Sequence, residues 1–120
     1  MFQTGNERID NDHARIIELV NALDDNGLPL DKRYNLFSYT AVYIENHLSI
    51  EEDFMYTIGY PGIKEHLQEH RKLKVEFIEL LKELVKDEPS TKSMKDFKML
   101  FLHHIEHWDC NVAKWQSSNN

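Results

Sequence analysis

Two histidines in the stretch GIKEHLQEHRK, His66 and His70, are four residues apart. On an α-helix this spacing places both rings on one face, one turn apart. The same spacing joins His47 to Glu51 in the stretch HLSIEE. Imidazole nitrogens and carboxylate oxygens are donor atoms with which proteins bind transition metals. Both pairs therefore have the residue types and the spacing of a metal site built on helices.

Further candidates come from the first and last parts of the chain. His13 and His104 each fall on a stripe of apolar residues at helical spacing. Asp109 follows His104 by five residues, or about 140° of helix rotation, so its carboxylate starts on the flank of that stripe. His107 starts on the other flank and forms a second HxxxH pair with His103. Spacing alone does not choose between Asp109 and His107, and the simpler interpretation of His103 and His107 is a pair of solvated surface histidines.

Four long helical segments are expected to position these residues. Glycine and proline fall in three clusters that divide the chain, and no β-type alternation of apolar residues is present. The expected helices cover residues 11–25, 31–58, 63–86 and 91–115, and the expected N-caps are Asp10, Asp31 and Ser90. Short turns between long helices favour an all-α fold, an up-down-up-down antiparallel four-helix bundle with a metal site in its core. We expect one domain over residues 1–120.

The burial of so many polar side chains needs an explanation. Each buried imidazole without a partner would cost roughly 1–3 kcal/mol, and a buried carboxylate more, against a total stability of about 5–15 kcal/mol. A metal centre would turn these groups into ligands. The depth of the residues is a constraint, because His47 lies 14 residues before Pro61 and His66 only 5 after it. The second and third helices would therefore have to be offset to bring these two rings together.

Composition narrows the class of protein. Lys and Arg number 14 against 21 Asp and Glu, and the net charge of −7 disfavours nucleic acid as a partner. Cys110 is the only cysteine, so no internal disulfide is expected and a reducing cytoplasm suits the chain. No apolar run approaches the roughly 20 residues that span a bilayer, and the N-terminus lacks the pattern of a signal peptide. We expect a soluble, cytoplasmic protein that binds neither nucleic acid nor membrane.

Four motifs occur in a particular order: IDNDH, HLSIEE, HLQEH and HIEHWD. In this order they resemble the hemerythrins, particularly the bacterial single-domain forms. The resemblance covers nearly the whole chain. The sequence departs from the family where a tryptophan and a leucine usually precede the last histidine, because Leu100 and Phe101 stand there.

The resemblance implies a non-haem di-iron centre, two iron ions joined by a bridging oxo or hydroxo group. The seven implied ligands are His13, His47, Glu51, His66, His70, His104 and Asp109. The three histidines of the last two helices would hold one iron, the two histidines of the first two helices the other, and both carboxylates would bridge. One coordination position would then stay open, on the iron with two histidines.

The implied function is reversible binding of dioxygen, as a carrier, store or sensor and not as an enzyme. Nitric oxide and azide are further small ligands that such a centre would accept. A second interpretation is a di-iron enzyme with peroxidase, oxidase or nitric-oxide chemistry. A third is a redox- or oxygen-sensing interaction domain. A histidine-rich ligand set favours the first, since oxygen-activating di-iron bundles are rich in carboxylates.

Overall fold

The chain is all-helical in the computed structural model, which describes residues 3–24, 28–86 and 94–119. The helices are α1 (Glu7–Leu23), α2 (Leu30–Ile58), α3 (Ile63–Lys86), α4 (Met94–His104) and α5 (Cys110–Ser118), with a π-helical segment, η1 (Ile105–Asp109), between the last two. No strand occurs in the described ranges. Because α4, η1 and α5 run on as one rod, the molecule has four rods, and the predicted four-helix bundle is confirmed.

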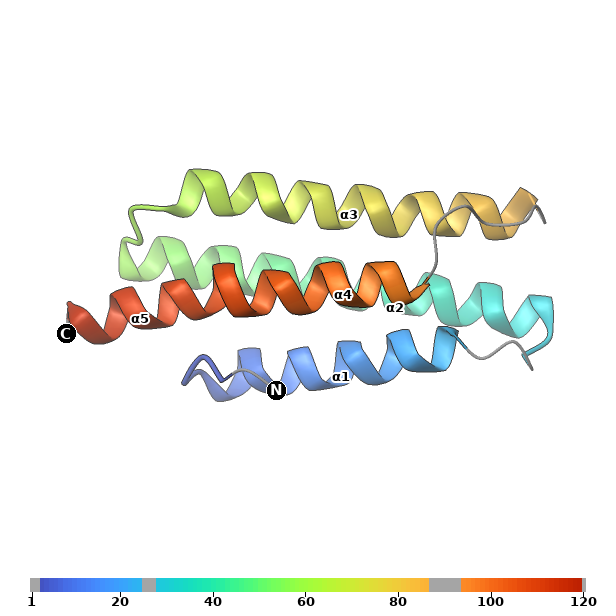
Figure 1. Cartoon of the computed structure of the whole chain (residues 1–120), viewed down its shortest axis with the longest axis horizontal. Helices are drawn as coiled ribbons and strands as arrows, with labels where there is room; N and C mark the ends of the chain where they lie inside the picture. The colour runs from blue at the N-terminus through green and yellow to red at the C-terminus, as the bar shows by residue number, and fades with distance from the viewer. Residues whose placement is uncertain (1–2, 25–27, 87–93, 120) are drawn as a thin grey trace.

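Successive rods run in opposite directions, as Figure 1 shows, and the bundle measures 49 × 23 × 19 Å. α1 packs against α2 and α4, and α3 packs against α2 and α4, so that every rod has two neighbours. The turn between α2 and α3 and the end of α5 lie at the same end of the bundle (Figure 1). This is the up-down-up-down order expected from short connections.

The core is divided along the length of the bundle. Its main apolar cluster comes mostly from the half farther from the α2–α3 turn: Ile16, Val20, Leu23, Phe37, Ile44, Leu48, Leu73, Phe77, Leu80, Met94, Phe97, Phe101 and Ile105. Nearer that turn, the buried side chains are mostly histidines and carboxylates. Apolar side chains are buried beyond them as well, from Ile9, Met55 and Val112. A polar layer thus lies between two apolar layers.

The helix ends differ in part from the sequence prediction. α1 begins four residues earlier than expected, because the Asn6 side chain caps it by accepting from the Ile9 N–H at 3.1 Å. Asp10, the expected cap, lies in the first turn and accepts hydrogen bonds from the backbone N–H and the hydroxyl of Thr4, both at 2.8 Å. α2 begins after Pro29 without a side-chain cap, and Asp31 lies in its first turn. The predicted Ser90 cap falls outside the described residues.

α2 ends at Ile58 and is followed by Gly59, which adopts a left-handed conformation with φ of +69°. Its N–H bonds the carbonyl of Tyr56, and this is the usual role of glycine after a helix. In the described part of the chain, no helix is long and apolar enough to cross a membrane.

Candidate metal centre

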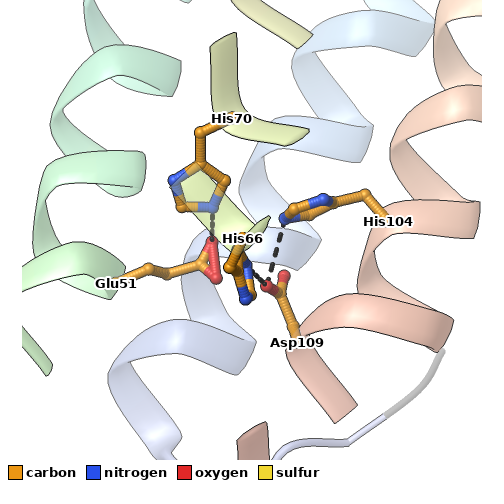
Figure 2. A group of neighbouring side chains, drawn as sticks. All are labelled: Glu51, His66, His70, His104 and Asp109. Atoms are coloured by element: carbon orange, nitrogen blue, oxygen red, sulfur yellow. Dashed lines mark ion pairs between the residues drawn. The ribbon is translucent and has the colours of Figure 1, made fainter. Parts of the chain in front are cut away.

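The polar layer holds all seven residues that the sequence singled out as ligands. Each is at most 3% exposed, although five of them are histidines and two are carboxylates. Their donor atoms form two groups, within each of which all atoms lie within 4.8 Å of one another. The first group is Glu51, His66, His70, His104 and Asp109 (Figure 2), and the second is His13, His47, Glu51 and Asp109. The two groups share both carboxylates.

The Asp109 carboxylate lies between the two sets of histidines. Its Oδ1 is 3.0 Å from His66 Nε2 and 3.1 Å from His104 Nε2, and both contacts are drawn as dashed lines in Figure 2. Its Oδ2 is 2.9 Å from His13 Nε2, on the opposite side. One oxygen of the carboxylate thus faces each set, which is the arrangement that a bridging ligand needs.

Glu51 occupies the corresponding place on α2. Its Oε1 is 2.9 Å from His47 Nε2 and 3.8 Å from His70 Nε2. The equal depth of Glu51 and His70 follows from counting along the helices. Glu51 lies seven residues before Ile58, the end of α2, and His70 lies seven residues after Ile63, the start of α3. The offset expected from the sequence is therefore not needed, because Glu51, not His47, lies level with His70, and His47 and His66 belong to different groups of donor atoms.

The π-helical segment η1 explains the position of Asp109. The Cys110 N–H bonds the carbonyl of Ile105, five residues earlier, so this turn holds one residue more than an α-helical turn. Five residues then make nearly one full turn, and Asp109 comes back beneath His104. His103 and His107 are both exposed, with ring centroids 4.2 Å apart, which agrees with the interpretation of surface histidines.

The orientation of the buried donor atoms fits a metal. Eight buried atoms of the cluster have no hydrogen-bond partner in the described part of the chain. They are Glu51 Oε1, both carboxylate oxygens of Asp109, and the Nε2 atoms of His13, His47, His66, His70 and His104. Within each of the two groups these oxygens and ring nitrogens lie within 4.8 Å of one another, but they make no hydrogen bonds among themselves. Since each unsatisfied buried polar atom costs about 1–3 kcal/mol, the cluster needs another partner. Imidazole and carboxylate donors suit an iron ion, and the shared carboxylates suit a pair of them.

Protonation of the cluster also favours metal binding. Burial, together with the neighbouring His13, lowers the pKa of His47 to about 4. Burial, together with His104 and His66, lowers the pKa of His70 to about 2. Both rings are therefore neutral near pH 7, and neutral imidazole is the form that binds metal.

The two carboxylates differ in their protonation. Burial, and then the negative charge of Asp109, raises the pKa of Glu51 well above its usual range. Burial acts in the same direction on Asp109, but His104 and the adjacent His13 and His66 lower the pKa of Asp109 well below its usual range. Without a cation, the site therefore favours an ionised Asp109 and a protonated Glu51. A bound cation would favour the ionised form of both carboxylates.

Comparison with known proteins agrees with this geometry. Residues 4–115 match the model of a family described as the hemerythrin HHE cation binding domain. The chain belongs to the hemerythrin family. It is also similar to a bacteriohemerythrin of Clostridium acetobutylicum, with 33% identity over 75 residues. The similar region covers 58% of each of the two chains, so this chain spans little more than half the length of that hemerythrin relative. Among solved structures, none matches the chain.

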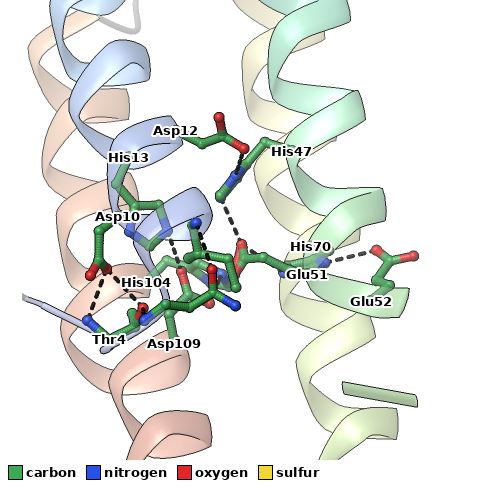
Figure 3. Close-up of polar contacts among 12 residues, drawn as sticks. Thr4, Asp10, Asp12, His13, His47, Glu51, Glu52, His70, His104 and Asp109 are labelled. Atoms are coloured by element: carbon green, nitrogen blue, oxygen red, sulfur yellow. Dashed lines mark hydrogen bonds and ion pairs between the residues drawn. The ribbon is translucent and has the colours of Figure 1, made fainter. Parts of the chain in front are cut away.

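Two further carboxylates of this hemerythrin-family chain were missed by the sequence analysis (Figure 3). Asp12 Oδ2 lies 3.1 Å from His47 Nδ1, and Glu52 Oε2 lies 2.7 Å from His70 Nδ1. Each binds the ring nitrogen that faces away from the cluster, and such contacts fix ring orientation and raise ligand basicity at metal sites. Both residues directly adjoin a predicted ligand in sequence, which was the only signal available.

Proposed function

We propose that this chain binds dioxygen reversibly at a non-haem di-iron centre with a bridging oxo or hydroxo group, as an oxygen carrier, store or sensor. One observation carries the proposal: the two groups of buried donor atoms share both Glu51 and Asp109. Two separate mononuclear sites would have no need of common carboxylates. The family and the bacteriohemerythrin relative support the same proposal.

The position of each side chain supports the proposed ligand roles. The histidines of α3 and α4 would hold one iron, and those of α1 and α2 the other. Glu51 and Asp109 would bridge them, since each lies between the two sets. When bound, two ferrous ions would together supply the two electrons that reversible dioxygen binding requires.

The surroundings of the two-histidine set favour binding of a small neutral molecule. The Phe101 ring, which is fully buried, packs edge-on against His13 with ring centroids 5.9 Å apart. This apolar wall withholds hydrogen-bond partners from water and anions. The carboxylates behind the ligands, Asp12 and Glu52, are both engaged by imidazoles. They are thus ill placed to serve as a catalytic acid or base, and for this reason we propose a ligand-binding protein and not an enzyme.

The proposal extends to the whole chain as one domain over residues 1–120, since the family model spans nearly all of it. A single free cysteine, Cys110, fits a reducing compartment, and we propose the cytoplasm. Dioxygen is the proposed partner, and nitric oxide and azide are small ligands that the same site would take.

The test is an optical spectrum of iron-loaded protein, reduced without oxygen and then exposed alternately to air and to vacuum. Bands that appear in air, vanish under vacuum and return over several cycles are expected, with two irons per chain by elemental analysis. One metal per chain, or zinc that iron does not displace, would contradict the di-iron centre. Irreversible oxidation on first exposure to air would contradict reversible binding.

A further inference from the structure

The His47 ring is held from both sides. Its Nε2 lies 2.9 Å from Glu51 Oε1, within the metal cluster, and its Nδ1 lies 3.1 Å from Asp12 Oδ2, outside it. The His47 side chain is fully buried, and that of Asp12 is 9% exposed. Because Asp12 belongs to α1 and His47 to α2, this contact also ties two helices together (Figure 3).

Asp12 has two further donors. The Tyr43 hydroxyl donates to Asp12 Oδ1 at 3.1 Å, and Arg8 Nε lies 3.5 Å from Asp12 Oδ2. Burial, and then the hydrogen bond to Asp12, raises the pKa of Tyr43, so its phenol keeps the proton that it donates. A line of contacts therefore runs from Tyr43 through Asp12 and His47 to the two-histidine half of the centre.

His70 also contacts a carboxylate through its Nδ1, but that carboxylate is less shielded from solvent than Asp12. Glu52 Oε2 accepts from His70 Nδ1, but the Glu52 side chain is 26% exposed, so water competes for its charge. The charge of Asp12 is instead divided mainly among side chains. Changes in those side chains should therefore reach His47 with little damping by solvent.

We propose that Asp12 and Tyr43 are positioning residues that set how strongly His47 donates electrons to its iron, and thereby the reduction potential of the two-histidine half. The inference rests on the proposed di-iron function. A carboxylate that accepts the Nδ1–H bond makes an imidazole a stronger donor, and a stronger donor favours ferric over ferrous iron. The Tyr43 hydroxyl draws part of the Asp12 charge to itself and so weakens this effect.

Two substitutions should consequently shift the potential in opposite directions. Asp12→Asn removes the negative charge behind His47, so the midpoint potential should rise. Tyr43→Phe removes a competing donor and leaves more of the Asp12 charge for His47, so the potential should fall. If these residues only packed the helices together, both substitutions would loosen the site, and the midpoint potential would not shift in opposite directions.

The experiment is an anaerobic redox titration of the iron-loaded protein, followed by its optical spectrum. For each tenfold change in the ratio of ferric to ferrous affinity, the midpoint moves by about 59 mV. Asp12→Asn should also release iron to a chelator faster, since contacts of this kind typically contribute 10–100-fold to metal affinity. Tyr39→Phe is the matched control, because the Tyr39 ring lies 6.2 Å from that of Tyr43 and its side chain is 52% exposed.

A second readout keeps the test independent of redox behaviour and of any instability of Asp12→Asn. In zinc-loaded protein, the proton on His47 Nδ1 should move downfield in the NMR spectrum of Tyr43→Phe and stay in place in Tyr39→Phe. Shifts of the same sign in Asp12→Asn and Tyr43→Phe, or no shift in Tyr43→Phe by either readout, would overturn the inference. Both measurements are made without oxygen, so they decide it even if reversible oxygen binding fails. Protein that takes up no metal would overturn the inference and the proposed function together.

Discussion

Cys110 donates its backbone N–H to the carbonyl oxygen of Ile105, five residues earlier, where a regular α-helix would bond four residues earlier. This one wide turn adds a residue to the fourth rod without turning the rest of the rod away from the core. His104, before the turn, and Asp109, at its end, therefore contact each other, with 3.1 Å between His104 Nε2 and Asp109 Oδ1.

Deletion of Glu106 should be tolerated by the site. Glu106 is exposed and lies inside the wide turn, and its removal should restore a regular α-helix with the aspartate four residues after His104, on the same face. Deletion of Met99, which is 65% exposed but lies in regular α4, should rotate Met94 and Phe97 by about 100° relative to His104. We expect the first variant to keep its iron and the second to lose it, as measured by iron per folded chain. Equal loss in both would show that the extra residue is required.

Asp109→Ala and His107→Ala separate the two residues between which sequence spacing could not choose. Asp109 is 3% exposed and contacts three imidazoles, whereas the His107 side chain is 56% exposed. Asp109→Ala should reduce iron from two per chain to one or none, because both halves lose a ligand. The His107→Ala variant should bind two irons, and its free energy of unfolding should lie within about 0.5 kcal/mol of that of the unmodified protein. The reverse result would remove Asp109 from the ligand set.

Periodicity predicted the four helices and the apolar faces on which the six other clustered residues lie, whereas Asp109 entered the predicted ligand set only through the resemblance to the hemerythrins. A stripe of apolar residues interrupted by His13, His47 or His104 marks the face that must be buried. The start of α1 was wrong because Asn6 and Asp10 are both good N-cap residues. The choice between them depends on Thr4, which engages Asp10.

The other features that were missed depend on tertiary structure. A π-helical turn has no characteristic amino-acid composition, so the sequence did not predict one here. On a regular α-helix, the five-residue spacing of His104 and Asp109 does not place the two side chains on one face. Asp12 and Glu52 each point about 100° away from the neighbouring predicted ligand on their own helix. They reach the ring of a histidine on a different helix, and only the packing of the helices shows this.

Three consecutive carboxylates on α2 should show graded effects. Glu51 lies in the cluster, Glu52 lies behind His70, and Asp53 is exposed. Glu51→Ala should abolish the paired centre. Glu52→Ala should retain it with about 10–100-fold weaker iron affinity, and Asp53→Ala should have no effect. Competition with a chelator measures the iron affinity of each variant. If the Glu52→Ala variant binds iron as tightly as the Asp53→Ala variant, the contact of Glu52 with His70 is dispensable.

Metal-free protein should lose stability as the pH falls from about 6.5 to about 4.5. Unfolded histidine has a pKa near 6.5, but the pKa of folded His47 is about 4 and that of folded His70 about 2, so over this range the unfolded chain binds two more protons at these rings. Glu51 acts in the opposite sense, because its raised pKa lets the folded chain keep a proton that the unfolded chain has lost. The net difference is about one proton, and the free energy of unfolding should fall by roughly 1 kcal/mol per pH unit.

Glu51→Gln provides the internal check on this sign, since glutamine cannot titrate. Without the opposing proton, the metal-free variant should lose stability about twice as steeply over the same range. Urea unfolding of both proteins at several pH values between about 4.5 and 6.5 measures the two slopes. A slope that is unchanged in Glu51→Gln would mean that Glu51 is already ionised in the folded, metal-free protein. A flat profile for both proteins would mean that His47 and His70 take up protons without unfolding, which a buried cluster of neutral ligands does not allow.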